Sequence, residues 1–298
     1  MDLWRTKSDV IVDAAIYLVL ALLAVVTLYP FLNALAISLN DAKDTGRGGI
    51  GIIPRVFTIE NYKVIINNDS LFRAYMITIS RTLVGTVSSV IATAMFAYGL
   101  SKSYLKGRSF YMIVCLITMY FSGGLIPTYL LIKSLHLINN FLVYVIPSMI
   151  SVWNTVIMMT YFKGLPDAIE ESAKVDGAGI FRIFFNIVLP VSAPIIATIS
   201  LFNGVYQWNA WFDAAIYITN ENLKPVQSLL VSIIDTSKFA EAMAKAGLDA
   251  ERMGAANAIN ARSVTMATMI TAVLPIIMVY PFLQKYFVKG VMIGSVKG

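Results

Sequence analysis

The chain has 298 residues, of which 58% are hydrophobic and 13% are charged, and its mean hydropathy is +0.73. So few polar residues cannot cover a soluble surface of this size, which excludes a soluble globular protein. The net charge of +6 does not indicate nucleic-acid binding, because Lys and Arg are dispersed among loops and form no stripe with interleaved aromatic residues. The single cysteine, Cys115, excludes a disulfide framework and a Cys/His metal site.

Six apolar runs without Asp, Glu, Lys or Arg are long enough to cross a membrane, which takes about 20 residues. The runs are unbroken, which favours helices over the alternating pattern of outer-membrane strands. The sequence therefore predicts an all-α polytopic membrane protein whose residues 1–298 form one transmembrane domain. Its transmembrane helices are expected at about 11–39, 74–100, 109–132, 141–162, 188–214 and 263–284.

Basic residues at the chain ends predict the orientation. Arg5 and Lys7 precede a first span that is too long for a secretory signal and lacks a cleavage site. The positive-inside rule places this head in the cytoplasm, and an even number of spans returns the C-terminus to the same side. Residues 40–73 and 216–262 are then outside segments, the first with a short surface helix near Glu60.

The second and third predicted spans carry unusual residues. Arg81 lies in the second span, where its side chain either snorkels to the lipid headgroups or faces a water-filled path that attracts an anionic substrate. In the third span, Ser122-Gly123-Gly124 and Pro127 free backbone groups from the helical ladder. Such a segment is tolerated at membrane depth only against protein or a wet cavity, so we expect this span to be kinked and to face inward.

Polar residues in the fourth and fifth spans suggest either helix packing or a substrate path. Ser200, Asn203 and Gln207 share one helical face, where they serve helix–helix hydrogen bonds or line a path. Trp208, Trp211 and Tyr217 fit an aromatic belt at the outer interface, with sugar stacking as the alternative. The candidate path residues are Arg81, Tyr120, Trp153, Asn154, Ser200, Asn203, Gln207, Trp208 and Asn209.

Residues 163–190, here named the charged loop, gather acidic and basic side chains between two uncharged runs. Pro166 fits the first position of a helix, where a missing N–H costs nothing, and Gly177 fits the left-handed position that ends one. A second helix, about 179–188, is rich in Phe and Ile. The pattern predicts two helices joined by a turn at Gly177, here named the elbow. Together they form a protrusion that a cytoplasmic partner could bind.

The charged loop resembles a known motif. Glu171-Ser172-Ala173-Lys174-Val175-Asp176-Gly177-Ala178, followed at fixed spacings by Phe184, Ile187, Leu189 and Pro190, is similar to the EAA loop of membrane subunits in binding-protein-dependent ABC importers. Only Ser172 departs from the usual alanine, one small residue for another. The segments 121–135 and 280–298 and the Trp208-Asn209 pair resemble the MalG-like carbohydrate branch of these importers, in particular the permeases for complex oligosaccharides.

This resemblance implies a type I ABC importer permease in the bacterial cytoplasmic membrane. The EAA helix would dock on a cytoplasmic ATPase subunit through Glu170, Glu171, Ala173, Asp176, Gly177 and Ala178. The implied partners are a homologous permease, two ABC ATPase subunits and an external solute-binding protein. The chain has no G-x4-G-K-[ST] loop, so we expect no catalytic residues, metal or cofactor in it, with ATP and Mg bound by the ATPase subunits.

The resemblance also implies the cargo, an oligosaccharide. The basic residues at Arg81 and outside the membrane suggest uronate-containing sugars, such as those derived from alginate or pectin. An ABC permease for a non-sugar solute is the nearest alternative. A secondary transporter is a weaker one, because it would need carboxylates within the spans, and Asp13 and Asp213 lie only at the edges of the runs.

Overall fold

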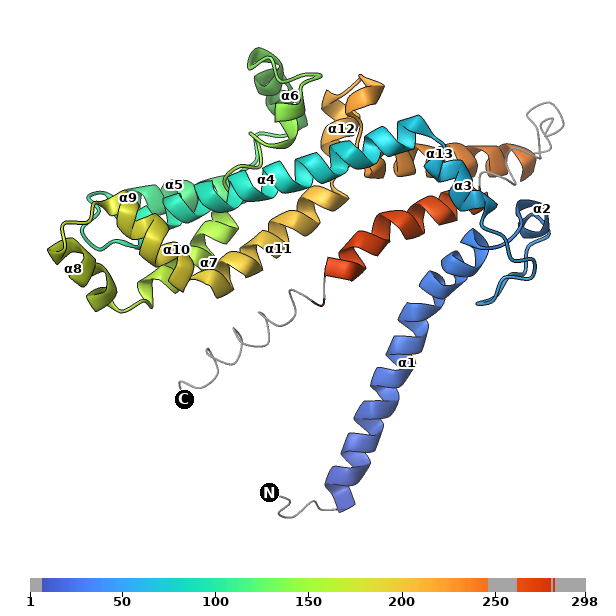
Figure 1. Ribbon diagram of the computed structural model, residues 1–298, viewed down its shortest axis with the longest axis horizontal. Coiled ribbons are helices and arrows are strands. Elements are labelled where there is room, and N and C mark those ends of the chain that lie inside the picture. The colour runs from blue at the N-terminus through green and yellow to red at the C-terminus, as the bar shows by residue number, and fades with distance from the viewer. Residues whose placement is uncertain (1–6, 246–261, 280, 282–298) are drawn as a thin grey trace. The chain divides into compact units, whose positions relative to one another are not determined.

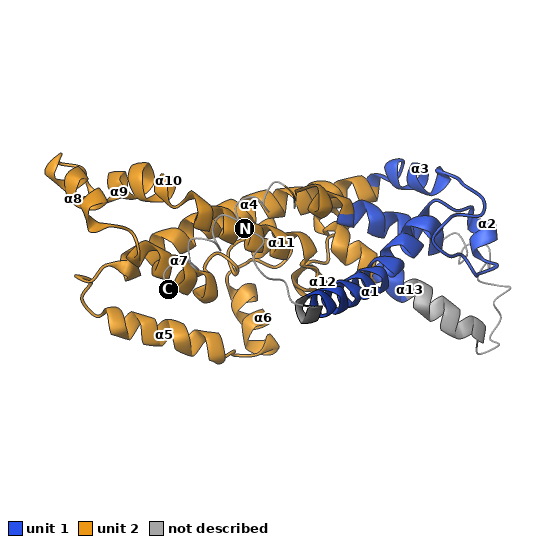
Figure 2. Ribbon diagram, turned by 90° about the horizontal axis from the view of Figure 1, so that it is seen from below, with its two compact units in different colours: residues 1–69, 232–273 blue, residues 70–231, 274–298 orange. Residues whose placement is uncertain are grey.

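The structure is a computed structural model that describes residues 7–245, 262–279 and 281. These residues form helices and connecting loops; within them the only β pairing is an isolated bridge between Asn40 and Phe57. The chain divides into two compact units (Figure 2): unit 1 comprises 1–69 and 232–273, and unit 2 comprises 70–231 and 274–298. That the whole chain forms one transmembrane domain stays a prediction.

The helices follow one another as shown in Figure 1. They are α1 (Lys7–Ser38), α2 (Ala42–Thr45), α3 (Glu60–Ile66), α4 (Asp69–Ser101), α5 (Arg108–Tyr120), α6 (Leu125–Ser134), η1 (Phe141–Tyr144), α7 (Val152–Lys163), α8 (Asp167–Val175), α9 (Ile180–Ile183), the π-helix η2 (Phe184–Val188), α10 (Leu189–Val191), α11 (Ala193–Asn209), α12 (Phe212–Tyr217), η3 (Glu221–Leu223), α13 (Val226–Lys245) and an unlabelled helix, Arg262–Val279.

Three helices are long and apolar enough to cross a membrane, namely Val10–Ser38, Asp69–Ser101 and Arg262–Val279. They correspond to the first, second and sixth predicted spans. The third and fifth correspond to bent pairs, α5 with α6 and Ile180–Val191 with α11, which brings the total to at most 5 in the described part. The count of six therefore stays a prediction.

The fourth predicted span, 141–162, differs most from expectation. It consists of the short 3-10 helix η1, a non-helical stretch and then α7, which has only 12 residues. A helix of that length falls short of the about 20 residues that a full crossing takes. Its apolar composition alone gave no sign of the break. The later part of the predicted outside segment 216–262 and most of the tail 280–298 lie outside the described residues.

The third predicted span breaks as the glycine pair suggested. α5 and α6 are bent by 116° at the residues between them. Gly124 caps α6 with φ 85° and ψ 175°, a backbone region open almost only to glycine. The predicted kink is confirmed, and Gly124 is the residue that permits it.

One of the two buried apolar clusters in the described part of unit 2 lies where α4 ends. Tyr98 of α4 makes an edge contact with Phe162 of α7 and a tilted contact with Phe184 of η2, with ring centroids 6.1 and 5.2 Å apart. Met158 and Ile183 are buried in the same cluster. This cluster attaches the helices of the charged loop, α8 to α10 in Figure 1, to the end of α4.

Unit 1 contains the loop between α1 and α4, which the sequence predicts to lie outside the membrane. The Asn40 side chain lies fully buried at its centre, where it donates to Asp44 and Thr45 and accepts from the Val56 N–H. The hydrogen bond from Asn40, followed by the charge of Arg55, holds the pKa of Asp44 below its usual range. The expected surface helix is present as α3. The loop is thus an ordered polar structure.

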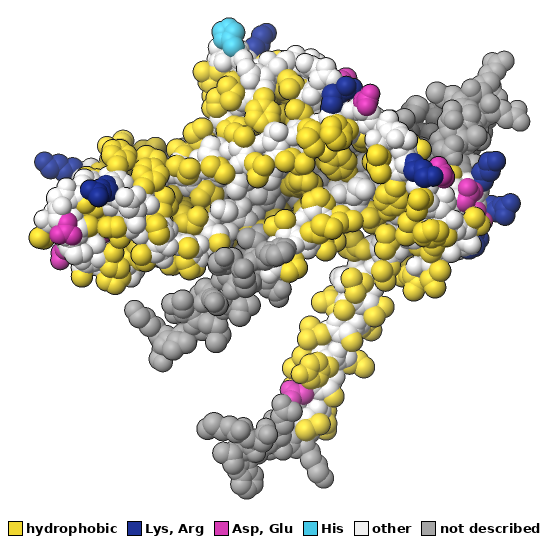
Figure 3. Space-filling view, in the orientation of Figure 1, with side chains coloured by type: hydrophobic (Ala, Val, Ile, Leu, Met, Phe, Trp, Pro, Cys, Tyr) yellow, Lys and Arg dark blue, Asp and Glu magenta, His cyan; other side chains and the backbone are white. Residues whose placement is uncertain are grey.

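Side chains on the surface are sorted by type. Figure 3 shows hydrophobic side chains over most of the visible helix surfaces, whereas charged side chains lie near α8 and α9 in unit 2 and around α2 and α3 in unit 1. Large apolar side chains along α1 and α4, such as Leu22 and Leu83, are more than half exposed. A soluble monomer rarely exposes so much apolar area, so these helix faces fit lipid or a partner chain.

We predict that Gly124→Ala destabilises the protein by about 1–3 kcal/mol, because the side chain strains the required backbone conformation. Gly123→Ala is the matched control: Gly123 lacks a positive φ, and its added Cβ would lie 3.8 Å from Pro127, an ordinary contact. Thermal unfolding of the purified protein in detergent measures both. Equal midpoints for the two variants would contradict the role given to Gly124.

Candidate functional site

The charged loop contains the predicted helix, elbow and second helix. α8 follows Pro166 and ends at Val175, two residues before Gly177, whose φ is 76°. The Ala178 N–H donates to the Ala173 carbonyl at 2.9 Å, and the Gly177 N–H donates to the Lys174 carbonyl at 3.0 Å. This pair of bonds is the Schellman motif, which requires a left-handed residue. The elbow predicted at Gly177 is confirmed.

The two glutamates of α8 face in different directions. The Glu170 side chain is only 11% exposed and forms an ion pair with Lys102, whose ammonium lies 4.2 Å from the centroid of the Tyr98 ring. Ala173, one turn on, is buried beside it. Glu171 is exposed, because the next position of a helix points about 100° away.

The remaining candidates of the charged loop are on its outside. Asp176 and Gly177 are exposed and Ala178 is half-buried. Of the six predicted docking residues, Glu171, Asp176 and Gly177 are therefore open to a partner, whereas Glu170 and Ala173 face the body of unit 2. The sequence did not distinguish these two groups, since all six belong to one motif.

A π-helix follows the elbow. η2 lies directly before Leu189-Pro190. Proline has no N–H for the carbonyl four residues earlier, and a widened turn accommodates that loss without ending the helix. Ser192 then marks a bend of 84° between Ile180–Val191 and α11. The charged loop is thus joined to α11 by a helical segment that bends and breaks at Ser192.

Arg81 lies in a buried ionic network. Its side chain is fully buried, and its guanidinium donates to both carboxylate oxygens of Asp213, at 3.1 and 2.6 Å. It also donates to the Ala210 carbonyl and stands 4.2 Å from the centroid of the Tyr144 ring. Arg81 therefore does not reach the headgroups, as snorkelling would require. Its charge is neutralised inside unit 2, because an unpaired buried charge costs several kcal/mol.

Gln207 completes this network. Its side-chain oxygen accepts from the Arg81 guanidinium at 3.1 and 3.2 Å, and its amide nitrogen donates to the Tyr144 carbonyl and the Ser148 hydroxyl. Gly85 makes room for it, since a Cβ there would lie 2.6 Å from the Gln207 amide nitrogen. The network joins α4, η1, α11 and α12.

Asn203 makes the second contact of the polar stripe. It accepts from the Ser89 hydroxyl of α4 at 3.2 Å and donates to the Ile199 carbonyl. Asn203 and Gln207 thus form hydrogen bonds between helices, one of the two roles that the sequence left open. A part for either in a substrate path stays a prediction.

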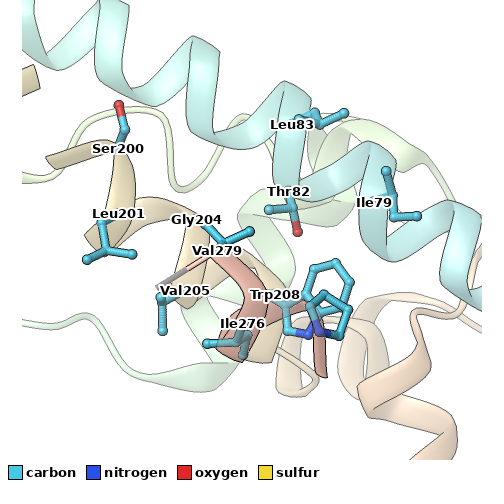
Figure 4. Close-up of a pocket in the computed structure, with 11 residues that line it drawn as sticks. Ile79, Thr82, Leu83, Ser200, Leu201, Gly204, Val205, Trp208, Ile276 and Val279 are labelled. Carbon is cyan, nitrogen blue, oxygen red and sulfur yellow. The ribbon is translucent and has the colours of Figure 1, made fainter. Parts of the chain in front are cut away.

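Ser200 and Trp208 line an apolar cavity of about 310 Å³ in unit 2. Figure 4 shows it between α4, α11 and the last helix, with Thr82 pointing toward the Trp208 ring. Trp208 and Tyr217 are buried, whereas Trp211 is 40% exposed, so the belt expected of all three does not fit the first two. Within the described residues, no cluster of His, Cys, Asp or Glu could hold a metal ion.

Residues 90–293 match the family described as binding-protein-dependent transport system inner membrane component. The chain belongs to this family. The permease is 36% identical to the polygalacturonan/rhamnogalacturonan transport system permease protein YtcP of Bacillus subtilis (strain 168), over 96% of this chain and 98% of that one. It is also 36% identical to Protein LplC of the same organism, over 99% and 97% of the two chains.

A solved structure matches the permease in fold. It is described as the crystal structure of a bacterial ABC transporter involved in the import of the acidic polysaccharide alginate. The TM-score is 0.84 at 27% identity, over 95% of this chain and 99% of that chain. The fold is therefore that of a type I ABC importer permease, and the protein is a membrane component rather than an enzyme, as the sequence predicted.

The other path candidates are distributed over different environments. Tyr120 and Trp153 are 83% and 62% exposed, and Asn209 is exposed. Asn154 is buried at the start of α7. The structure does not gather the nine candidates into one pocket. Sequence reasoning missed four residues of this site, Lys102, Asp213, Tyr144 and Gly85, since their partners lie far away along the chain.

We predict that Asp213→Asn lowers the stability of the permease by about 3 kcal/mol, because it leaves the buried Arg81 charge unpaired. The matched control is Glu221→Gln, which removes an exposed ion pair with Lys224 that is worth about 1 kcal/mol or less. Thermal unfolding in detergent measures both variants. A midpoint for Asp213→Asn as high as that of Glu221→Gln would show that the buried pair contributes little.

Proposed function

We propose that this permease conducts uronate-containing oligosaccharides inward across the bacterial cytoplasmic membrane. The observation that carries the proposal is the 36% identity, over nearly the whole of both chains, to a permease named for polygalacturonan and rhamnogalacturonan transport. The fold match to an importer of alginate, another acidic polysaccharide, supports the same class of cargo. Arabinooligosaccharide permeases among the relatives, at 23% and 26% identity, also carry sugars but are more distant.

The sequence-based reason for this cargo has to be replaced. A free positive charge at Arg81 suggested attraction of an anionic sugar, but Asp213 neutralises that charge inside unit 2. The proposal therefore rests on the relatives. Within the permease, the exposed aromatic residues Tyr120 and Trp153 and the exposed Asn209 remain candidates for the path, because aromatic faces and amides suit the apolar and hydroxyl faces of a sugar.

The proposed assembly contains a homologous permease, two ABC ATPase subunits that bind ATP and Mg, and an external solute-binding protein. The charged loop docks on an ATPase through Glu171, Asp176 and Gly177, and both chain termini lie in the cytoplasm. ATPase closure moves the charged loop, the helices rock, and the path opens to the other side. The exposed apolar helix faces leave room for the second permease and for lipid.

The proposed cargo is tested by reconstituting the importer, with its binding protein outside and ATP inside proteoliposomes, and measuring uptake of labelled tri-galacturonate and maltotriose. We expect tri-galacturonate to enter at least about tenfold faster, because only this sugar carries the carboxylates that the proposed cargo requires. Faster uptake of maltotriose would contradict the proposed cargo and indicate that the permease conducts neutral oligosaccharides. Uptake of neither sugar would favour a non-sugar cargo, the alternative that the sequence left open.

We predict that Gly177→Val abolishes co-purification of the ATPase, because a β-branched residue resists the left-handed elbow that presents Glu171 and Asp176. Gly179→Val is the matched control: its φ is −70°, and space is open around it. Pull-down of the ATPase with the tagged permease measures both. Normal recovery of the ATPase with Gly177→Val would show that docking does not depend on the elbow.

A further inference from the structure

We infer that the Lys102–Glu170 ion pair is the joint through which the charged loop moves α4. This inference rests on the proposed function, since it assigns Glu170 to the transmission of movement rather than to contact with the ATPase. Glu170 and Lys102 are then positioning residues. Their side chains are 11% and 15% exposed, so a cytoplasmic partner has little access to either.

The ion pair is a directional contact that holds α8, next to the apolar contact of Ala173. Of the nine residues of this helix, only Glu170 and Ala173 are buried. The contact of Ala173 allows α8 to shift along the rest of unit 2, because a methyl group is small and its packing is non-directional. A hydrogen-bonded ion pair holds only in one geometry, and here the Tyr98 ring fixes the lysine as well, at 4.2 Å from its ammonium. The register of α8 on unit 2 therefore depends on Glu170.

Lys102 connects that hold to α4. It directly follows Ser101, the last residue of α4, and its N–H donates to the Gly99 carbonyl. The same helix carries Arg81, roughly 30 Å away along its axis at 1.5 Å per residue. A long helix transmits displacement with little bending, so a pull on Glu170 reaches the Arg81 network that joins α4 to α11 and α12.

The neighbouring lysine of α8 does not provide a similar hold. The Lys174 ammonium lies 5.9 Å from the centroid of the Tyr104 ring, near the limit of a cation–π contact, and Lys174 is exposed. Glu171 is exposed as well. Adjacent glutamates of one motif thus have separate tasks: Glu171 faces outward to the ATPase, and Glu170 faces inward to Lys102.

The test compares Glu170→Gln, Lys102→Met and the double variant in the complete importer reconstituted in proteoliposomes. We expect each single variant to retain the ATPase in pull-down but to lower the tri-galacturonate imported per ATP hydrolysed about tenfold. The double variant should be no worse than either single one, because both remove the same ion pair. Lys102→Arg, which keeps the charge, should restore coupling to within about twofold of wild type.

Asp167→Asn and Lys106→Met are the matched controls, since each removes an exposed charge from the same region. Both should couple like wild type. Loss of the ATPase from Glu170→Gln in pull-down would overturn the inference and make Glu170 a docking residue, leaving the proposed function intact. The inference would also be overturned if the losses of coupling in the two single variants multiplied in the double variant. Unchanged coupling in both single variants would overturn it too.

Failure of the proposed function gives a different result. If the wild-type importer accumulates no tri-galacturonate, the proposed cargo is wrong. The inference about the Lys102–Glu170 ion pair is then tested by ATPase activity alone. Stimulation of ATP hydrolysis by the binding protein should fall at least about fivefold in Glu170→Gln but not in Asp167→Asn. Equal stimulation in these two variants would overturn the inference whatever the cargo.

Discussion

A charge inside a membrane protein must be paired, and the arrangement of unit 2 follows from meeting that requirement for Arg81. Among the described residues, the partners of its guanidinium lie near residues 144 and 207–213, more than 60 positions further along the chain. The partners can meet it only if η1, α11 and α12 pack around α4. Gly85 supports this packing by leaving space for Gln207 beside α4.

The same helix ends at a second paired charge. Lys102 and Glu170 join the end of α4 to the charged loop, while the aromatic cluster of Tyr98, Phe162 and Phe184 surrounds the joint. α4 thus carries an ionic contact at each of two levels, one to the charged loop and one to α11 and α12. This arrangement suits a subunit that receives movement at one end and uses it elsewhere.

Local features were predictable from the sequence. The elbow at Gly177 and the break at Gly124 depend on glycine conformations, and the long helices depend on uninterrupted apolar runs. Pairings across the chain were not predictable in this way. Arg81 and Asp213 lie at the edges of different apolar runs, and Glu170 and Glu171 are adjacent in a motif that treats them alike. Only the positions of the helices decide which charge faces which.

The most direct test of the account is a cryo-EM structure of the importer, with its ATPase and partner permease, at a resolution that shows side chains. The account predicts Glu171 against the ATPase, Glu170 paired with Lys102, and Arg81 paired with Asp213 inside the permease. A map that places the Glu170 carboxylate in the ATPase interface, with Lys102 turned to solvent, would contradict it.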